Sequence, residues 1–161
     1  MPPQLLMNFG SRFELTEVQD ESGYWSGEYL GRSMVSLDFN RDHLTDLIIN
    51  HLDQPAALLE NQTDTSGKSL ELELIGTSSE RDAIGTRVTL EISDNQSATA
   101  WVTAGDGYLC SDEPTLKFGL GLNQDADSLV INWPSGKNQI FRNVDSGRYL
   151  AIEGQEQLFA R

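Results

Sequence analysis

The clearest pattern in the chain is an alternation of apolar and charged side chains near its middle. Leu70, Leu72 and Leu74 alternate there with Glu71 and Glu73. Because successive side chains of a strand point to opposite faces, this period of two predicts a half-buried strand. A register shift of one residue would bury the glutamates in place of the leucines. We therefore expect the leucines to face a core and the glutamates to face solvent.

Short apolar stretches separated by Gly, Asp and Asn turns predict strands along the rest of the chain, and no segment convincingly predicts a helix. Before residue 61 we expect strands at 4–8, 13–15, 33–37, 47–50 and 56–60. After it we expect them at 70–74, 87–92, 98–103, 116–118, 129–133, 139–141 and 149–152. Many short strands at close spacing are typical of a sandwich or a barrel, so the predicted fold class is all-β.

The polar stretch 61–67 predicts a boundary between two parts, residues 1–64 and residues 65–161. In the first part, Leu5-Leu6-Met7-Asn8 is echoed by Leu58-Leu59-Glu60-Asn61 at an offset of 53 residues. Repeats of about this length, built of short strands, are typical of propeller blades. A closed propeller takes at least about four blades, so we expect part of a propeller whose remaining blades belong to a parent chain.

The polar loop between two of these strands carries oxygen ligands at regular spacing. Asp38, Asn40, Asp42 and Asp46 occupy its first, third, fifth and ninth positions, and the backbone carbonyl of Leu44 is available at the seventh. A curled loop turns such groups inward, where they suit a hard cation. No thiolate is at hand and only one histidine lies in the loop, so the spacing predicts calcium rather than zinc.

This loop resembles the calcium loop of FG-GAP or VCBS propeller blades, with three departures. Such loops usually carry Gly at the sixth position, where this chain has His43, and Asn40 replaces a frequent Asp. Arg41 adds a positive charge beside the site. We therefore expect weak calcium binding, with a Kd of about 10⁻⁴ to 10⁻³ M. The alternative is a loop without metal, held by Asx-turn hydrogen bonds.

Four motifs in the second part resemble, in order, the signature of the ASPIC/UnbV domain. They are SERDAIGTRV at 79–88, GDGYL at 105–109, FGLG at 118–121 and INWPSGK at 131–137. The resemblance implies an independent β-sandwich-like or barrel-like module that follows partial propeller blades in a secreted, periplasmic or cell-surface protein. It implies no accepted biochemical activity.

Charge and composition narrow the choice of partners. The chain has 11 Lys and Arg against 25 Asp and Glu, for a net charge of −14, which argues against nucleic acid and anionic membranes. No apolar run is long enough to cross a bilayer, and the first residues do not resemble a signal peptide. We expect any export signal to belong to the parent chain. The lone Cys110 rules out a disulfide within the chain.

A catalytic centre is not predicted, because the only histidines are His43 and His51 and no nucleophile, base and orienting group occur together. A carboxylate-based hydrolase using a pair such as Asp125 and Asp127 is a distant alternative. We expect a non-catalytic module that binds a protein partner and associates through open blade edges. The second alternative is a glycan-binding face on which the aromatic rings of three side chains stack: Trp101, Tyr108 and Trp133.

The strand pattern also predicts a core for the second part. Its expected members are Leu72, Leu74, Val88, Leu90, Trp101, Phe118, Leu120, Val130, Ile131, Trp133 and Leu150.

Overall fold

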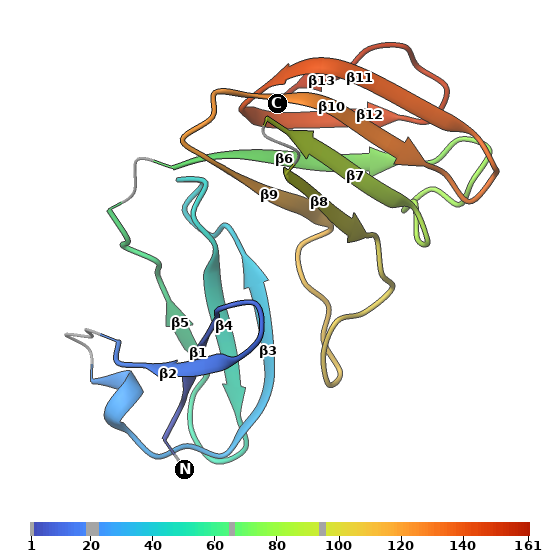
Figure 1. The fold of residues 1–161 in the computed structure, drawn as a ribbon. Helices are drawn as coiled ribbons and strands as arrows, with labels where there is room; N and C mark the ends of the chain where they lie inside the picture. Colours follow the sequence, from blue (N-terminus) through green and yellow to red (C-terminus); the bar gives the residue numbers. More distant parts are fainter. Residues whose placement is uncertain (1, 19–22, 65–66, 94–95) are drawn as a thin grey trace.

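The computed structural model describes residues 2–18, 23–64, 67–93 and 96–161. Its regular elements are strands apart from one 3-10 turn, η1 (Tyr24–Ser26), which confirms the predicted all-β class. The strands form four sheets, none of which closes into a barrel. Two of these sheets lie in the first part of the chain and two in the second (Figure 1). The predicted boundary between residues 64 and 65 falls beside positions 65 and 66, which lie outside the described residues.

The second part is a sandwich of two four-stranded sheets. One has the order β13-β12-β6-β9, with bounds Phe159–Ala160, Gly147–Ile152, Lys68–Ile75 and Thr115–Gly121. The other has the order β11-β10-β7-β8, with bounds Asn138–Asp145, Asp125–Asn132, Arg87–Ile92 and Gln96–Trp101. All neighbouring strands are antiparallel except β12 and β6, which run parallel. Strand β13 is an element that the sequence pattern did not predict.

Apolar side chains from both sheets form one core. Leu70, Leu72 and Leu74 of β6 pack with Phe118 of β9 and with residues of the facing sheet such as Ile131. Burial of this kind is the main favourable term in folding, at about 25 cal/mol per Å² of apolar surface. The predicted inward face of β6 is thereby confirmed.

Three predicted core residues lie elsewhere. Trp101 is 56% exposed, because Ala98 and Ala100 occupy the inward positions of the edge strand β8 and the next side chain points outward. The guanidinium of Arg87 lies over its ring, 5.8 Å from the centroid. Val130 and Leu150 are only partly buried, since their neighbours in the strand take the core positions.

The first part contains a three-stranded antiparallel sheet and a hairpin. The sheet has the order β3-β4-β5, with bounds Gly31–Leu37, Asp46–His51 and Ala57–Leu59. The hairpin pairs β1 (Leu5–Asn8) with β2 (Phe13–Thr16). His51 anchors a small aromatic cluster here: its ring stacks on Tyr29 at 4.8 Å, and its Nε2 lies 2.9 Å from the hydroxyl of Tyr24.

One edge of the three-stranded sheet is covered by the second part of the chain. The segment that connects β8 to β9 reaches down to β3 (Figure 1). The backbone N–H of Glu113 donates to the carbonyl of Ser36 at 3.1 Å, and the backbone N–H of Ser36 donates to the carboxylate of Asp112 at 2.7 Å. Cys110 donates its thiol to the carbonyl of Met34 at 3.3 Å. The β3 edge is therefore protected, while β5 pairs only with β4.

We predict that Phe118→Ala lowers the free energy of unfolding by about 3 to 5 kcal/mol, because Phe118 is buried between the two sheets. Trp101→Ala is the control, since it removes a larger aromatic side chain from the surface and should cost less than about 1 kcal/mol. Urea unfolding of both variants measures the difference. Equal losses would contradict this assignment of the core.

Candidate functional site

The loop between β3 and β4 is curled by its own acidic side chains. Asp38 is buried, and its two carboxylate oxygens accept the backbone N–H groups of Asp42 and His43, each at 3.1 Å. Asp46 is fully buried and accepts the backbone N–H of Phe39 at 2.8 Å and that of Asn61 at 2.8 Å. These bonds close the loop and hold its first residues against its last.

The middle of the loop is organised in the same way. The side-chain oxygen of Asn40 accepts the backbone N–H of Asp42 at 3.0 Å, and Asp42 in turn accepts the N–H of Leu44 at 2.8 Å. The bond from Leu44, together with one from the Asn40 amide, lowers the pKa of Asp42 below its ordinary value. The predicted metal ligands are all oxygen atoms. A carboxylate oxygen that accepts one N–H still has a lone pair with which to bind a cation. This donor set fits a hard cation such as calcium.

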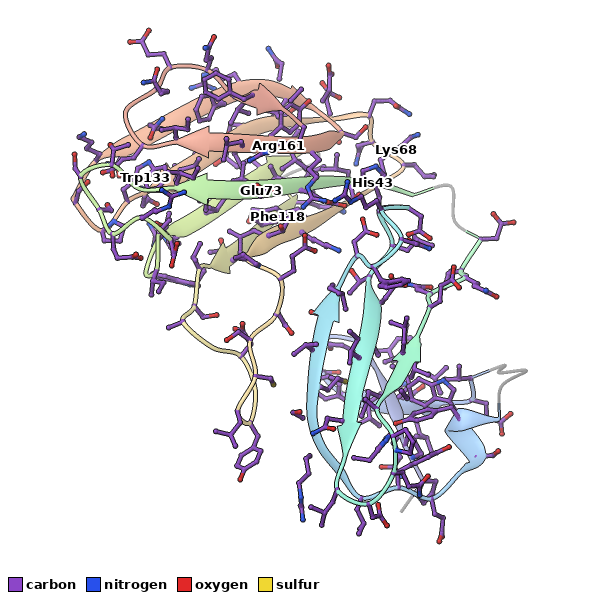
Figure 2. The ribbon with its side chains drawn as sticks, turned by 180° about the vertical axis from the view of Figure 1, so that it is seen from behind. His43, Lys68, Glu73, Phe118, Trp133 and Arg161 are labelled. Carbon is purple, nitrogen blue, oxygen red and sulfur yellow. The ribbon has the colours of Figure 1, made fainter. Side chains whose placement is uncertain are left out.

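His43 occupies the sixth position of the loop, where the resemblance stated above predicts glycine, and it adopts a left-handed conformation with φ 70°. Arg41 does the same with φ 64°. The side chain of His43 meets β6, the strand that carries Glu73 (Figure 2). Its Nδ1 lies 3.2 Å from Oε1 of Glu71. The loop of the first part thus contacts the sandwich through the side chain at its sixth position.

Glu71 was predicted to face solvent, and this prediction is wrong: its side chain is 1% exposed. The polar face of β6 is covered by the loop and by side chains of the neighbouring strands. In the sheet register, Glu71 lies opposite Lys117 of β9 and Arg148 of β12. Among the described residues, its Oε2 has no hydrogen-bond partner, and Nε of Arg148 forms an ion pair with it at 3.8 Å.

Arg148 is the centre of an ion-pair network on the same face. Its guanidinium donates to Glu73 at 3.0 Å and to Glu113 at 2.8 Å. Burial alone would lower the pKa of Arg148, but these two hydrogen bonds outweigh it and raise the pKa. Glu113 also accepts the backbone N–H of Asp38 at 3.3 Å, and Arg161 pairs with Glu73 at 3.1 Å. The network therefore links the loop to the sandwich.

The structure brings Asp38 together with His43 and Glu71. Their ligand atoms all lie within 4.8 Å of one another, and no other group of three His, Cys, Asp or Glu side chains in the described ranges meets that spacing. Asp42 and Asp46 are not part of this group. A cleft of about 810 Å³ opens beside it, lined by Asp38, His43 and the Arg148 network among others. Sequence reasoning missed Glu71, since its polarity indicated only a solvent face.

Comparisons with known proteins identify the family to which the second part of the chain is similar. The family described as ASPIC and UnbV matches residues 76–158, which is half of the chain and most of the sandwich. The chain belongs to the ASPIC and UnbV family. Human cartilage acidic protein 1 is 32% identical over 125 residues, covering 76% of this chain and 18% of the human protein. The mouse protein of the same name is 32% identical over 119 residues, covering 72% and 18%. The chain thus spans less than a fifth of the length of these relatives.

In the ASPIC and UnbV domain, the most elaborate polar contact is a buried carboxylate at the end of β12. Glu153 accepts the backbone N–H groups of Thr77, Ser78 and Ser79 at 2.8, 2.7 and 2.7 Å. The hydroxyl of Ser135 donates to its other oxygen. Two of the family motifs, which begin at Ser79 and contain Ser135, are thereby held at one point.

These bonds keep Glu153 ionised. Burial alone would raise the pKa of Glu153, but the hydrogen bonds from Ser135 and from the three backbone amides lower it to about 2. An oxygen that already accepts several N–H groups is a poor proton acceptor near neutral pH. Glu153 therefore acts as an anchor for the loop.

The three aromatic residues predicted for glycan stacking do not form one face. Trp133 is 3% exposed and belongs to the sandwich core, so it offers no ring to a ligand. Trp101 is exposed at the end of the edge strand β8, and Tyr108 is exposed within the segment that connects β8 to β9. Among the described residues, no helix is long and apolar enough to cross a membrane.

We predict that acid removes a specific part of the stability through Glu153. Its folded pKa of about 2 lies below its ordinary value of 4.5, so its contribution is complete above pH 4.5 and is lost as the pH falls toward 2. Glu153→Gln should cost about 2 kcal/mol at neutral pH, because it weakens hydrogen bonds to a charged group.

The measurement is urea unfolding at several pH values between about 7 and 2. The gap between wild type and Glu153→Gln should narrow as the pH falls. Glu156→Gln, at an exposed position, is the matched control and should follow wild type throughout. A gap that stays constant down to the lowest pH would contradict the assignment of a depressed pKa to Glu153.

Proposed function

We propose that this chain is a non-catalytic interaction module of a larger secreted or cell-surface protein. In this proposal, residues 1–64 are part of an FG-GAP or VCBS-type propeller, and the ASPIC and UnbV domain follows it. The observation that carries the proposal is the way the 38–46 loop, with its calcium-type ligand spacing, is built into the junction with that domain. Such a junction would hold the surfaces of the two parts in a fixed arrangement, which suits binding to a partner better than catalysis.

Exposed apolar side chains support a propeller origin for the first part. Leu6, Phe13 and Leu15 on the hairpin β1-β2 are exposed, as are Met34 on β3 and Leu58 on β5. Leu6 and Leu15 are cross-strand partners in the hairpin, and we propose that their exposed side chains belong to an interface. The proposed occupants are the remaining blades of the parent chain, whose relatives are more than five times as long as the matched segment. Association through the β5 edge belongs to the same proposal, because that edge pairs with β4 alone.

Two features support a non-catalytic role. The sequence contains two histidines, both outside the ASPIC and UnbV domain. His51 is buried and bonded on both ring nitrogens, to Tyr24 at 2.9 Å and to the carbonyl of Pro55 at 2.7 Å. The buried Glu153 has a pKa too low for a general base near neutral pH. Binding and display therefore fit the available groups better than acid-base chemistry does.

Calcium is the proposed ion of the loop, held by Asp38, Asn40, Asp42, Asp46 and the carbonyl of Leu44. All are oxygen ligands, and the loop is already curled by hydrogen bonds from its own backbone. An ion here would supply positive charge to the three carboxylates of the loop, which would move closer together around it. Because Asp38 also contacts Glu113 through its backbone, the bound ion would stiffen the junction as well as the loop.

We predict that calcium raises the melting temperature. An ion that binds only the folded state adds about 2.7 kcal/mol of stability at a hundredfold excess over Kd. Thermal melts with 10 mM CaCl₂, against 10 mM MgCl₂, cover the expected range, since a Kd of about 10⁻⁴ M gives that excess. Asp42→Ala should abolish the calcium shift. Asp127→Ala, at an exposed position on β10, is the matched control and should retain it. An unchanged melting temperature in wild type would refute the calcium site.

A further inference from the structure

One cluster of side chains, which shares Asp38 with the proposed calcium set, has the composition of a transition-metal site. We propose that Asp38, His43 and Glu71 bind a divalent transition-metal ion, with zinc as the best-fitting ion. The site uses a nitrogen ligand and a strand residue, neither of which belongs to the predicted calcium set. It lies where the 38–46 loop meets β6 of the sandwich.

The spacing of the donor atoms suits zinc. Two ligands at about 2.0 to 2.2 Å from a tetrahedral zinc ion lie about 3.4 Å apart. Nδ1 of His43 and Oε1 of Glu71 are already 3.2 Å apart, and the Asp38 ligand atom lies within 4.8 Å of both. Binding then requires Asp38 to turn toward the ion, which would exchange at least one of its bonds to the loop backbone for a bond to the metal.

The unpartnered oxygen of Glu71 is an independent observation that points to a ligand. Oε2 is buried and accepts no hydrogen bond, which is a costly state for a carboxylate. Nε of Arg148 forms an ion pair with Oε2 at 3.8 Å, but its guanidinium donates its hydrogen bonds to Glu73 and Glu113. The buried ammonium of Lys117 has no hydrogen-bond partner among the described residues. A metal ion that binds both carboxylate oxygens of Glu71 would give Oε2 the contact that it lacks.

The chemistry of the donors selects the class of ion. Imidazole together with carboxylates suits zinc and its neighbours in the first transition row, whereas calcium takes oxygen ligands alone. Three protein ligands leave a fourth position, which water can reach from the cleft that Asp38 and His43 line. His43 is 58% exposed on that side, so an ion has access to the site. A bound ion would cross-link the first part of the chain to the sandwich.

Isothermal titration of the whole chain with ZnCl₂ tests the proposal. We expect one ion per chain, and cobalt(II) should show a visible absorption spectrum that zinc removes. His43→Ala and Glu71→Gln should each weaken binding at least about tenfold, since even outer-shell changes cost that much. Asp53→Asn, at an exposed position outside the cluster, should bind as wild type does. The exposed His43 can be changed without disturbing the core, so its variant is decisive even if Glu71→Gln unfolds.

The outcomes separate this inference from the proposed calcium site. Asp42→Ala should lose the calcium shift and keep zinc binding, whereas His43→Ala should do the reverse. Absence of zinc binding in wild type, or unchanged affinity in His43→Ala, would overturn the zinc site and leave the calcium proposal standing. Zinc binding without any calcium shift would overturn only the latter.

Discussion

The carboxylate of Glu71 is buried in the middle of β6, and its need for partners organises the contact between the two parts of the molecule. The opposite face of the strand is occupied by the leucine core, so the charge cannot turn away. An ionised group removed from water must be paired or bonded. Arg148 and Lys117 lie beside it on the two neighbouring strands, and Nδ1 of His43 lies 3.2 Å from its Oε1. The loop therefore contacts the sandwich at the buried negative charge of Glu71.

Glu71 and Glu153 represent two ways to bury the same functional group. Glu153 is saturated by three backbone amides and by hydroxyl groups, which makes it rigid and chemically inert. Glu71 is left with one oxygen unbonded, which leaves it able to accept a further contact. Natural structures tolerate few incompletely satisfied buried groups, and those few are often functional. The two carboxylates therefore differ in their capacity for a further contact.

The sequence could predict most of the strands and one face of the central strand, because alternation reports directly on side-chain direction. It could not predict that the other face is covered, since polarity at Glu71 does not reveal a loop that comes from 28 residues away. Likewise Trp101 was expected in the core because it is large and aromatic. It follows the inward-facing Ala100 on an edge strand, so its side chain points outward. In the sequence, His43 stood out only because calcium loops of this type usually carry glycine at that position. Its partner depends on tertiary contacts that no local pattern encodes.

The segment that joins β8 to β9 has a consequence for how sheets of this protein can grow. Its residues 110–113 occupy the β3 edge with main-chain and side-chain bonds, as an added strand would. Only the β5 side of that sheet is left to recruit further backbone. A sheet extended from the first part could therefore grow in one direction, from the β5 edge, because the β3 edge is covered. Deletion of residues 110–113 would leave the β3 edge unpaired and open to the backbone of another chain.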